Sequence, residues 1–222
     1  MADIQRAQHL QIQNRWLKVI PPARGTNELG TTILCLHGWT GDEHSMDVFV
    51  RRLPDTCWIL APRAPHSAPE CGYSWGPPTP VRPAPWPAFT EAAHRLEKDL
   101  QVWLAHLALP RRSVNILGFS QGAAMALTYT ILYPEQVNRV AALSGFLPEG
   151  ANVALQAGRL SGKTLFLAHG VRDEIVPVAR AHESVELLKS AGANVLLCLE
   201  KTGHRTGIAC LQGMIDCLTA PQ

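Results

Sequence analysis

Apolar residues along the chain gather in short continuous runs, separated by stretches in which they recur with helical spacing. A short run that is apolar throughout is typical of a parallel strand that is buried on both faces. Residues 10–20 predict one or two edge strands, which Pro21 and Pro22 end. The buried strands are predicted at 33–36, 58–61, 114–117, 140–143, 164–168 and 195–199.

Helical spacing predicts four helices between and after these strands. The first opens at Thr90, and its apolar face consists of Leu96, Leu100, Trp103, Leu104 and Leu107. The second follows residue 120 and ends before Pro134, the third follows Pro177, and the fourth spans 208–218. Strands that alternate with helices build a doubly wound, mostly parallel sheet. We therefore predict one α/β domain over residues 1–222.

Residues 62–89 show neither the continuous apolar runs of the predicted strands nor the helical spacing of the predicted helices. Nine of the seventeen prolines lie there, interleaved with Tyr73, Trp75, Trp86 and Phe89. A loop this long in a compact domain is usually functional or disordered. Prolines stiffen a loop and indoles give it apolar surface, so we expect this segment to arch over the strand exits. The alternative is a packed structural crossover to the helix at Thr90.

A G-x-S-x-G pentapeptide, Gly118 to Gly122, stands between a predicted strand and a predicted helix. A strand that turns abruptly into a helix brings the flanking backbone close together, and glycine on each side of Ser120 avoids a collision. The serine hydroxyl is then exposed above a helix N-terminus, which favours developing negative charge. A plain Gly/Ser turn between a strand and a helix has the same sequence pattern. The residues downstream distinguish such a turn from a catalytic nucleophile.

A serine needs a histidine base to become a nucleophile, and the histidine needs an acid to fix its tautomer. Asp173 follows the strand predicted at 164–168, and His204 follows the one at 195–199. Catalytic groups of α/β sheets gather at the carboxyl ends of the strands. The order Ser, Asp, His at three strand exits therefore predicts a catalytic triad of Ser120, Asp173 and His204.

The exit of the strand at 33–36 reads His37-Gly38-Trp39. We expect the backbone N–H groups of Trp39 and Gln121 to form an oxyanion hole, since glycine at position 38 lets the main chain approach a substrate. His37 lies inside the turn, which suits a structural histidine better than a second base.

These segments resemble the phospholipase/carboxylesterase family of small α/β hydrolases, which includes acyl-protein thioesterases and lysophospholipases. The resemblance rests on Leu36–Asp42, Pro62–Pro65, Gly118–Gly122, Leu143–Gly145 and His169–Pro177. It implies an α/β-hydrolase fold and a serine carboxylesterase without cofactor or metal. A thioester or lysophospholipid substrate, an acyltransferase and a non-catalytic scaffold stay open as alternatives.

Bulky side chains near these motifs suggest a small substrate pocket. We expect Trp39, Trp75 and Trp86 to line it, which would favour esters of short to medium acyl length.

Charge and hydropathy argue against nucleic acid and a membrane span as partners, and the resemblance implies a small-molecule ester as substrate. The net charge is +2, and basic residues cluster only in pairs, which argues against nucleic acid. No apolar run approaches the length of a membrane span, and residues 1–14 lack the hydrophobic core of a signal peptide. We expect a cytoplasmic protein, either a monomer or a homodimer.

The six cysteines are scattered, and none forms a C-x-x-C pair, which argues against structural zinc. Cys35, Cys57 and Cys198 lie in apolar strand-like runs, where a thiol acts as a small hydrophobe. We interpret Cys210 and Cys217, on one face of the last helix, as packing residues. Cys71, in the proline-rich segment, is expected to be the most reactive thiol.

Overall fold

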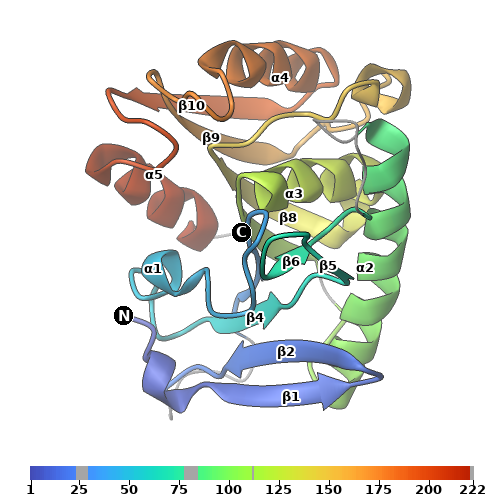
Figure 1. Ribbon diagram of the computed structural model, residues 1–222, viewed down its shortest axis with the longest axis vertical. Helices are drawn as coiled ribbons and strands as arrows, with labels where there is room; N and C mark the ends of the chain where they lie inside the picture. The colour runs from blue at the N-terminus through green and yellow to red at the C-terminus, as the bar shows by residue number, and fades with distance from the viewer. Residues whose placement is uncertain (24–29, 78–84, 112, 221–222) are drawn as a thin grey trace.

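An eight-stranded sheet runs through the computed structural model, which describes residues 1–23, 30–77, 85–111 and 113–220 (Figure 1). Its strand order is β1-β2-β4-β3-β7-β8-β9-β10. The first two strands form an antiparallel hairpin, β2 pairs antiparallel with β4, and all the other neighbours are parallel. The strands are β1 (Gln8–Ile12), β2 (Arg15–Ile20), β3 (Thr32–Leu36), β4 (Trp58–Pro62), β7 (Val114–Phe119), β8 (Val137–Leu143), β9 (Thr164–Gly170) and β10 (Asn194–Glu200).

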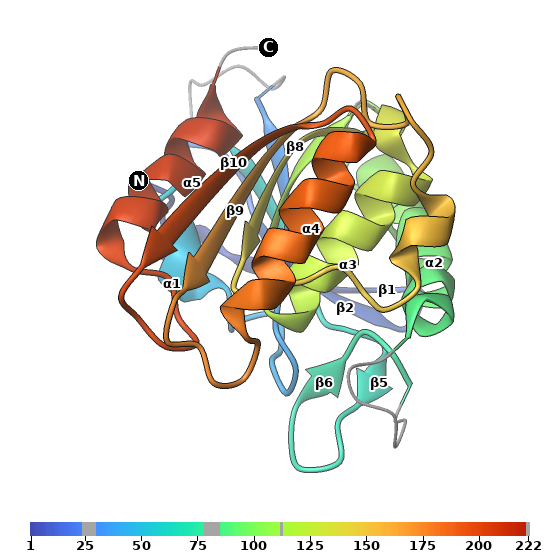
Figure 2. The same ribbon diagram turned by 90° about the horizontal axis from the view of Figure 1, so that it is seen from above.

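Helices cover both faces of the sheet, as the view in Figure 2 shows. On one face lie α2 (Trp86–His106), α3 (Gln121–Leu132) and α4 (Val178–Ser190); on the other lie α1 (Asp47–Val50) and α5 (Ile208–Thr219). Short 3₁₀ turns are found at Ile4–Arg6, Pro134–Gln136 and Ala151–Ala154. None of the helices among the described residues combines the length and the hydropathy that a membrane crossing requires.

The parallel strands divide the core into two layers because their side chains alternate between the faces. In β3, Leu34 and Leu36 pack beneath α2 and α3, whereas Ile33 and Cys35 face α1 and α5. All four are essentially inaccessible to solvent. This two-sided burial explains the continuous apolar runs in the sequence, and the predicted fold class is confirmed.

The predicted start of the first long helix was wrong. Helix α2 begins at Trp86 rather than at Thr90, with Pro85 as its N-cap and Pro87 in its first turn. Proline is compatible with this position because first-turn N–H groups have no acceptor within the helix. The segment 62–89 also contains a small hairpin of β5 (His66–Ser67) and β6 (Tyr73–Ser74). It is therefore only partly a loop; its residues 78–84 lie outside the described part of the chain.

The last strand also differs from expectation. We predicted that residues 195–199 are buried on both faces, but β10 is the final strand of the sheet. Leu196 is 51% exposed and Leu199 is 38% exposed. An edge strand has a neighbour on one side only, so the apolar run indicates its pairing with β9 but not its depth in the core.

Candidate active site

The backbone at Ser120 makes the sharp strand-to-helix turn that the pentapeptide predicts. Ser120 has φ 53° and ψ −117°, a conformation that costs a non-glycine residue free energy and that surrounding contacts must enforce. Its N–H donates to the Leu143 carbonyl of β8 at 2.8 Å. A Cβ atom on Gly118 would lie 2.4 Å from the Gly122 carbonyl oxygen. The turn therefore requires glycine and holds the Ser120 hydroxyl at the carboxyl end of β7.

Gly122 offers a test of this turn, because a Cβ atom there would lie 2.0 Å from the Leu36 carbonyl oxygen. Gly122→Ala is expected to lower the free energy of unfolding by more than about 3 kcal/mol, since backbone must move to relieve the overlap. Gly76→Ala is the matched control: its Cβ would meet nothing closer than Ala88 at 4.0 Å. Urea denaturation of both variants measures the difference. Equal stabilities would show that α3 does not pack against β3 as described.

Three side chains from separate strand exits form one hydrogen-bonded chain. The Nε2 atom of His204 lies 2.9 Å from Ser120 Oγ, and its Nδ1 atom lies 2.7 Å from Asp173 Oδ2. The other carboxylate oxygen of Asp173 accepts the backbone N–H groups of Ile175 and Val176 at 3.0 and 2.9 Å. The Asp173 side chain is fully buried, and that of His204 is 15% exposed. The structure thus brings the three predicted residues together, with the carboxylate held on both oxygens.

The loops that carry the acid and the histidine pack backbone against backbone. Val171 donates its N–H to Glu200, and Arg172 donates its N–H to Thr202, at 2.9 and 3.0 Å. A Cβ atom on Gly170 would lie 2.2 Å from the Gly203 carbonyl oxygen. This contact leaves no room for a side chain and fixes Asp173 relative to His204.

Two residues that contact these three side chains were not singled out in the sequence. Buried His169 donates from Nε2 to the Val176 carbonyl at 2.8 Å, and the same atom lies 3.4 Å from Asp173 Oδ2. Phe119, beside the serine, places its ring 5.2 Å from the His204 ring. The His-Gly motif that precedes Asp173 was the available signal for His169, but the sequence does not reveal which way its side chain points.

The main chain at the end of β3 passes beside the serine. A Cβ atom on Gly38 would lie 3.4 Å from Ser120 Cβ, so glycine permits this approach. Buried His37 supports the turn: its Nε2 accepts the Ala64 N–H at 3.0 Å, and its Nδ1 therefore carries the hydrogen that it donates to the Gly38 carbonyl. Burial lowers the pKa of His37 below its ordinary value. The structural interpretation of His37 agrees with these bonds.

The structure separates the three tryptophans that we expected to line a pocket. Trp39 is half-buried at the exit of β3. Trp75 is 2% exposed and donates its indole N–H to the His37 carbonyl, while Trp86 is 8% exposed in the first turn of α2. Both belong to the core beneath α2 and α3, so their expected place on an open pocket wall was wrong. Burying an indole removes a large apolar area from water, which outweighs the looseness that a proline-rich segment suggests.

The side chain of Gln121 ties the small hairpin to the serine turn. Its Oε1 accepts the Trp75 backbone N–H at 3.1 Å, and its Nε2 donates to Ser74 Oγ at 3.0 Å. The residue after the serine therefore anchors the segment 74–76 next to the strand exits.

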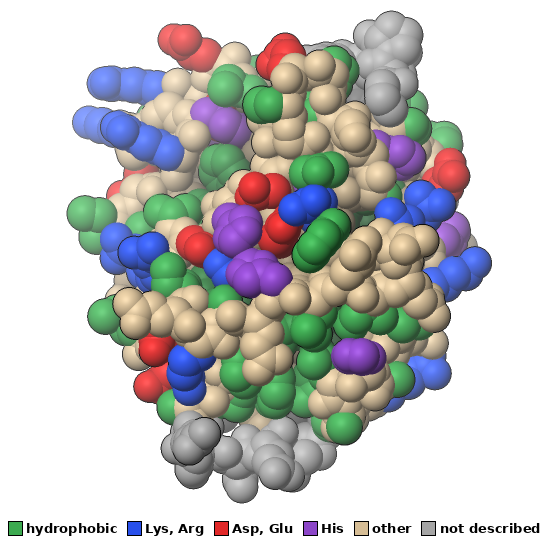
Figure 3. Space-filling view, turned by 60° about the horizontal axis from the view of Figure 1, so that its bottom comes forward, with side chains coloured by type: hydrophobic (Ala, Val, Ile, Leu, Met, Phe, Trp, Pro, Cys, Tyr) green, Lys and Arg blue, Asp and Glu red, His purple; other side chains and the backbone are tan. Residues whose placement is uncertain are grey.

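A second anchor joins the β3 exit to the hairpin. Arg63 forms two hydrogen bonds with the Glu43 carboxylate, at 2.6 and 2.5 Å, and donates to Tyr73 Oη at 3.0 Å. Burial opposes ionisation of Glu43, but the hydrogen bonds from Arg63 lower its pKa below the usual range. The ring of His44, the next residue, lies 4.9 Å from the ring of His9 in β1, with the two planes tilted by 31°. Figure 3 shows histidines, acids and bases gathered near the middle of one face of the molecule.

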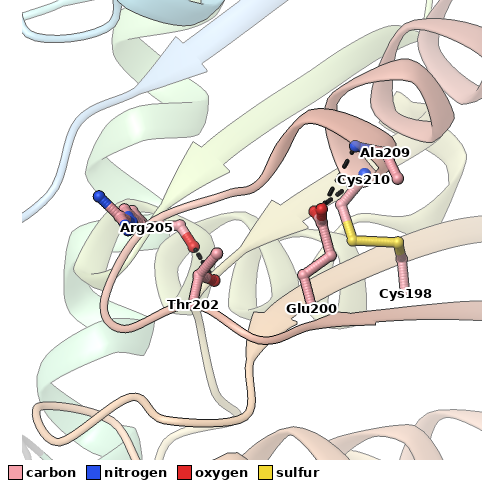
Figure 4. The surroundings of a disulfide bond; sticks show 6 residues. All are labelled: Cys198, Glu200, Thr202, Arg205, Ala209 and Cys210. Carbon is pink, nitrogen blue, oxygen red and sulfur yellow. Dashed lines mark hydrogen bonds between the residues drawn. A yellow bond between two sulfur atoms is a disulfide. The ribbon is translucent and has the colours of Figure 1, made fainter.

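One interpretation of the cysteines was wrong. Cys198 and Cys210, taken as packing residues, form a disulfide with a Cα–Cα distance of 5.7 Å (Figure 4). Their separation of 12 residues across a strand, a loop and a helix start does not reveal this proximity. Cys71 is exposed as expected, and Cys35, Cys57 and Cys217 are buried free thiols.

Comparison with known proteins gives matches along most of the chain. Residues 19–220 match the family described as Phospholipase/Carboxylesterase. A probable carboxylesterase of Oryza sativa subsp. japonica is 33% identical over 85 residues, which are 38% of this chain and 32% of that protein. The probable carboxylesterase SOBER1-like of Arabidopsis thaliana is 28% identical over 179 residues, 73% of this chain and 67% of that protein.

Solved structures also resemble this chain in fold. Acyl-protein thioesterase 2 of Zea mays is 25% identical with a TM-score of 0.74, and the alignment covers 92% of this chain and 97% of that one. The match to the rice protein spans about a third of that relative's length. The family match, in contrast, covers the strands from β3 to β10 and every strand exit described above. The chain belongs to the phospholipase/carboxylesterase family of α/β hydrolases.

Proposed function

We propose that this protein is a serine hydrolase that cleaves carboxylic esters through an acyl-enzyme. The observation that carries the proposal is the continuous hydrogen-bonded chain from Ser120 through His204 to Asp173. Asp173 accepts the Nδ1 hydrogen of His204, which leaves Nε2 as the acceptor that faces the serine hydroxyl. Family membership supports ester hydrolysis independently of this geometry.

In the proposed reaction, Ser120 Oγ attacks the acyl carbonyl while His204 takes the hydroxyl proton. His204 then protonates the departing alcohol, and Asp173 stabilises the imidazolium that forms between the two steps. Water, activated by the same histidine, releases the acid. The two bonds from backbone to Asp173 Oδ1 keep its other oxygen directed at His204 throughout.

We assign the oxyanion hole to the backbone N–H groups of Trp39 and Gln121. Charge that develops on the carbonyl oxygen is stabilised best by donors that are fixed in advance. The close approach of Gly38 to Ser120 supports the placement of the first donor. The side-chain bonds of Gln121 to residues 74 and 75 support the rigidity of the second.

A thioester is the second candidate substrate, because a solved neighbour is an acyl-protein thioesterase. Lysophospholipid hydrolysis and acyl transfer to an added alcohol use the same acyl-enzyme. Rates on matched oxygen and sulfur esters, with product analysis in the presence of alcohol, distinguish these reactions. A cytoplasmic location and the choice between monomer and homodimer stay predictions.

Covalent labelling tests the proposal against a non-catalytic scaffold. A fluorophosphonate reacts with a serine that a neighbouring base activates. We expect one label per chain, on Ser120, and none after Ser120→Ala. Absence of labelling in the folded wild-type protein would contradict an activated serine.

Trp39 is the tryptophan that we retain for the acyl pocket. Each methylene that fits a dry pocket gains about 0.8 kcal/mol, whereas one that meets a packed wall costs about 1 to 3 kcal/mol, so kcat/KM should rise over the first few carbons and then fall. Trp39→Ala is expected to move the optimum to longer acyl chains in a rate series of esters. Trp58→Ala is the control, because Trp58 lies at the start of β4, away from the strand exits. The same optimum in wild type and Trp39→Ala would remove this indole from the pocket.

A further inference from the structure

The Cys198–Cys210 disulfide spans the loop that carries His204. Cys198 lies near the end of β10, and Cys210 lies in the first turn of α5. His204 stands midway between them in the sequence. The crosslink, drawn in Figure 4, thus closes the base of this loop. The loop in turn holds the His204 imidazole against Ser120.

Glu200 forms a second connection across the same base. Its carboxylate accepts the backbone N–H groups of Ala209 and Cys210, at 3.4 and 3.1 Å, and so caps the start of α5. A Cβ atom on Gly207 would lie 2.3 Å from this carboxylate, which shows how closely the loop returns to the strand. The two connections act in parallel, and only the disulfide depends on oxidation state.

The position of the imidazole is sensitive to this loop. Proton transfer requires Nε2 to stay within hydrogen-bond distance of Ser120 Oγ, where it now lies at 2.9 Å. A displacement of about 1 Å in a catalytic geometry can cost up to about 100-fold in rate. Opening one of two parallel connections loosens the loop without releasing it, because Glu200 and the contacts with Val171 and Arg172 remain.

We propose that the Cys198–Cys210 disulfide positions His204, so that the oxidised protein is fully active and the reduced protein turns over more slowly. This inference rests on the proposed function, since it requires His204 to act as the base. Disulfides that form in cytoplasmic proteins are usually transient, with a catalytic or redox-sensing role.

The reduction is a two-electron step in which a dithiol is the reductant. One dithiol thiolate attacks Cys198 Sγ, because Cys198 is half-buried whereas Cys210 is 1% exposed. The S–S bond breaks, and Cys210 leaves as a thiolate that takes up a proton. The second thiol of the reductant then displaces Cys198. The products are two protein thiols and the cyclic disulfide of the reductant.

The test compares air-oxidised protein with the same protein reduced by dithiothreitol, at 25 °C and well below thermal unfolding. EDTA is included because the two freed sulfurs and Glu200 lie within 4.8 Å of one another and could hold a metal ion. We expect reduction to lower kcat about 10-fold with KM nearly unchanged, and to slow fluorophosphonate labelling by a similar factor. The melting temperature should fall by about 5 to 10 °C.

Three variants serve as comparisons. Cys198→Ser with Cys210→Ser should show the reduced kcat whether or not dithiothreitol is present. Cys71→Ser removes the exposed free thiol and should respond to dithiothreitol as wild type does. Glu200→Ala opens the non-covalent connection, so the oxidised variant should lose less activity than reduction costs the wild type. On reduction it should lose more than 10-fold, because both connections are then open.

Several outcomes would overturn the proposal. Six titratable thiols in unfolded, air-oxidised protein, instead of the four that the structure leaves free, would remove the disulfide itself. A lower melting temperature with unchanged kcat and labelling rate would reduce it to a purely structural crosslink. If Ser120→Ala is inactive and the two redox forms have equal kcat, this proposal alone fails; if Ser120→Ala is active, the proposed function fails and takes this proposal with it.

Discussion

Ser120→Ala is expected to lower kcat by about 10⁴- to 10⁶-fold while the fold is retained. Ser120 Oγ lies 2.9 Å from His204 Nε2. Alanine lacks this oxygen, so no acyl-enzyme can form. The residual rate would come from binding and oxyanion stabilisation alone. Initial rates on a chromogenic ester, with circular dichroism to verify folding, measure the loss.

Ser113→Ala is the matched control for this variant. Ser113 directly precedes β7, at the end of the strand opposite to Ser120. Its substitution should leave kcat within about two-fold, since it removes the same oxygen atom far from the site. Retention of more than a tenth of the activity in Ser120→Ala would refute the assigned nucleophile.

Asp173→Asn is expected to lower kcat by about 10⁴-fold at neutral pH, by analogy with other serine hydrolases, in which an amide at this position favours the wrong histidine tautomer. The carboxylate accepts hydrogens on both oxygens, from His204 on one and from two backbone N–H groups on the other. An amide has only one acceptor oxygen, so its NH₂ group must face either the backbone donors or the histidine. Each arrangement removes a hydrogen bond that holds the required tautomer.

Glu174→Gln is the control for the acid, because Glu174 is the exposed next residue. It undergoes the same change from carboxylate to amide without contact with His204, and its activity should stay near wild type. Equal losses in the two variants would indicate an electrostatic effect of the whole loop. A loss at Glu174 alone would move the role of the acid by one residue.

The sequence predicted the strand exits well because their pattern reflects strong local constraints. A parallel strand buried on both faces must be apolar throughout, and a turn as sharp as that at Ser120 must have glycine where backbone meets backbone. Asp173 follows such a strand, and His204 follows the neighbouring parallel edge strand β10, so their meeting is a consequence of sheet order. The hydrogen bond between them then depends on how the short loops after the two strands are held.

Other features depended on tertiary packing that leaves no local pattern. The position of the hairpin determines whether Trp75 lines a pocket or fills the core. Neither the sequence around Trp75 nor that around His37 indicates the hydrogen bond between the Trp75 indole and the His37 carbonyl. The pairing of Cys198 with Cys210 depends on how α5 returns to β10. Leu196 reads as a core residue because the sequence does not indicate that its strand is the last one in the sheet.

The backbone contact between Gly170 and Gly203 has a consequence for building chimaeras with other hydrolases. The loop at Gly203 fills the space that a side chain on residue 170 would need, whereas a Cβ atom on Gly203 would meet nothing closer than the Arg172 carbonyl oxygen at 3.8 Å. A donor protein with a bulkier residue at position 170 could not contribute that loop by itself. Residues 170–176 and 200–207 should therefore be exchanged together, as a single cassette.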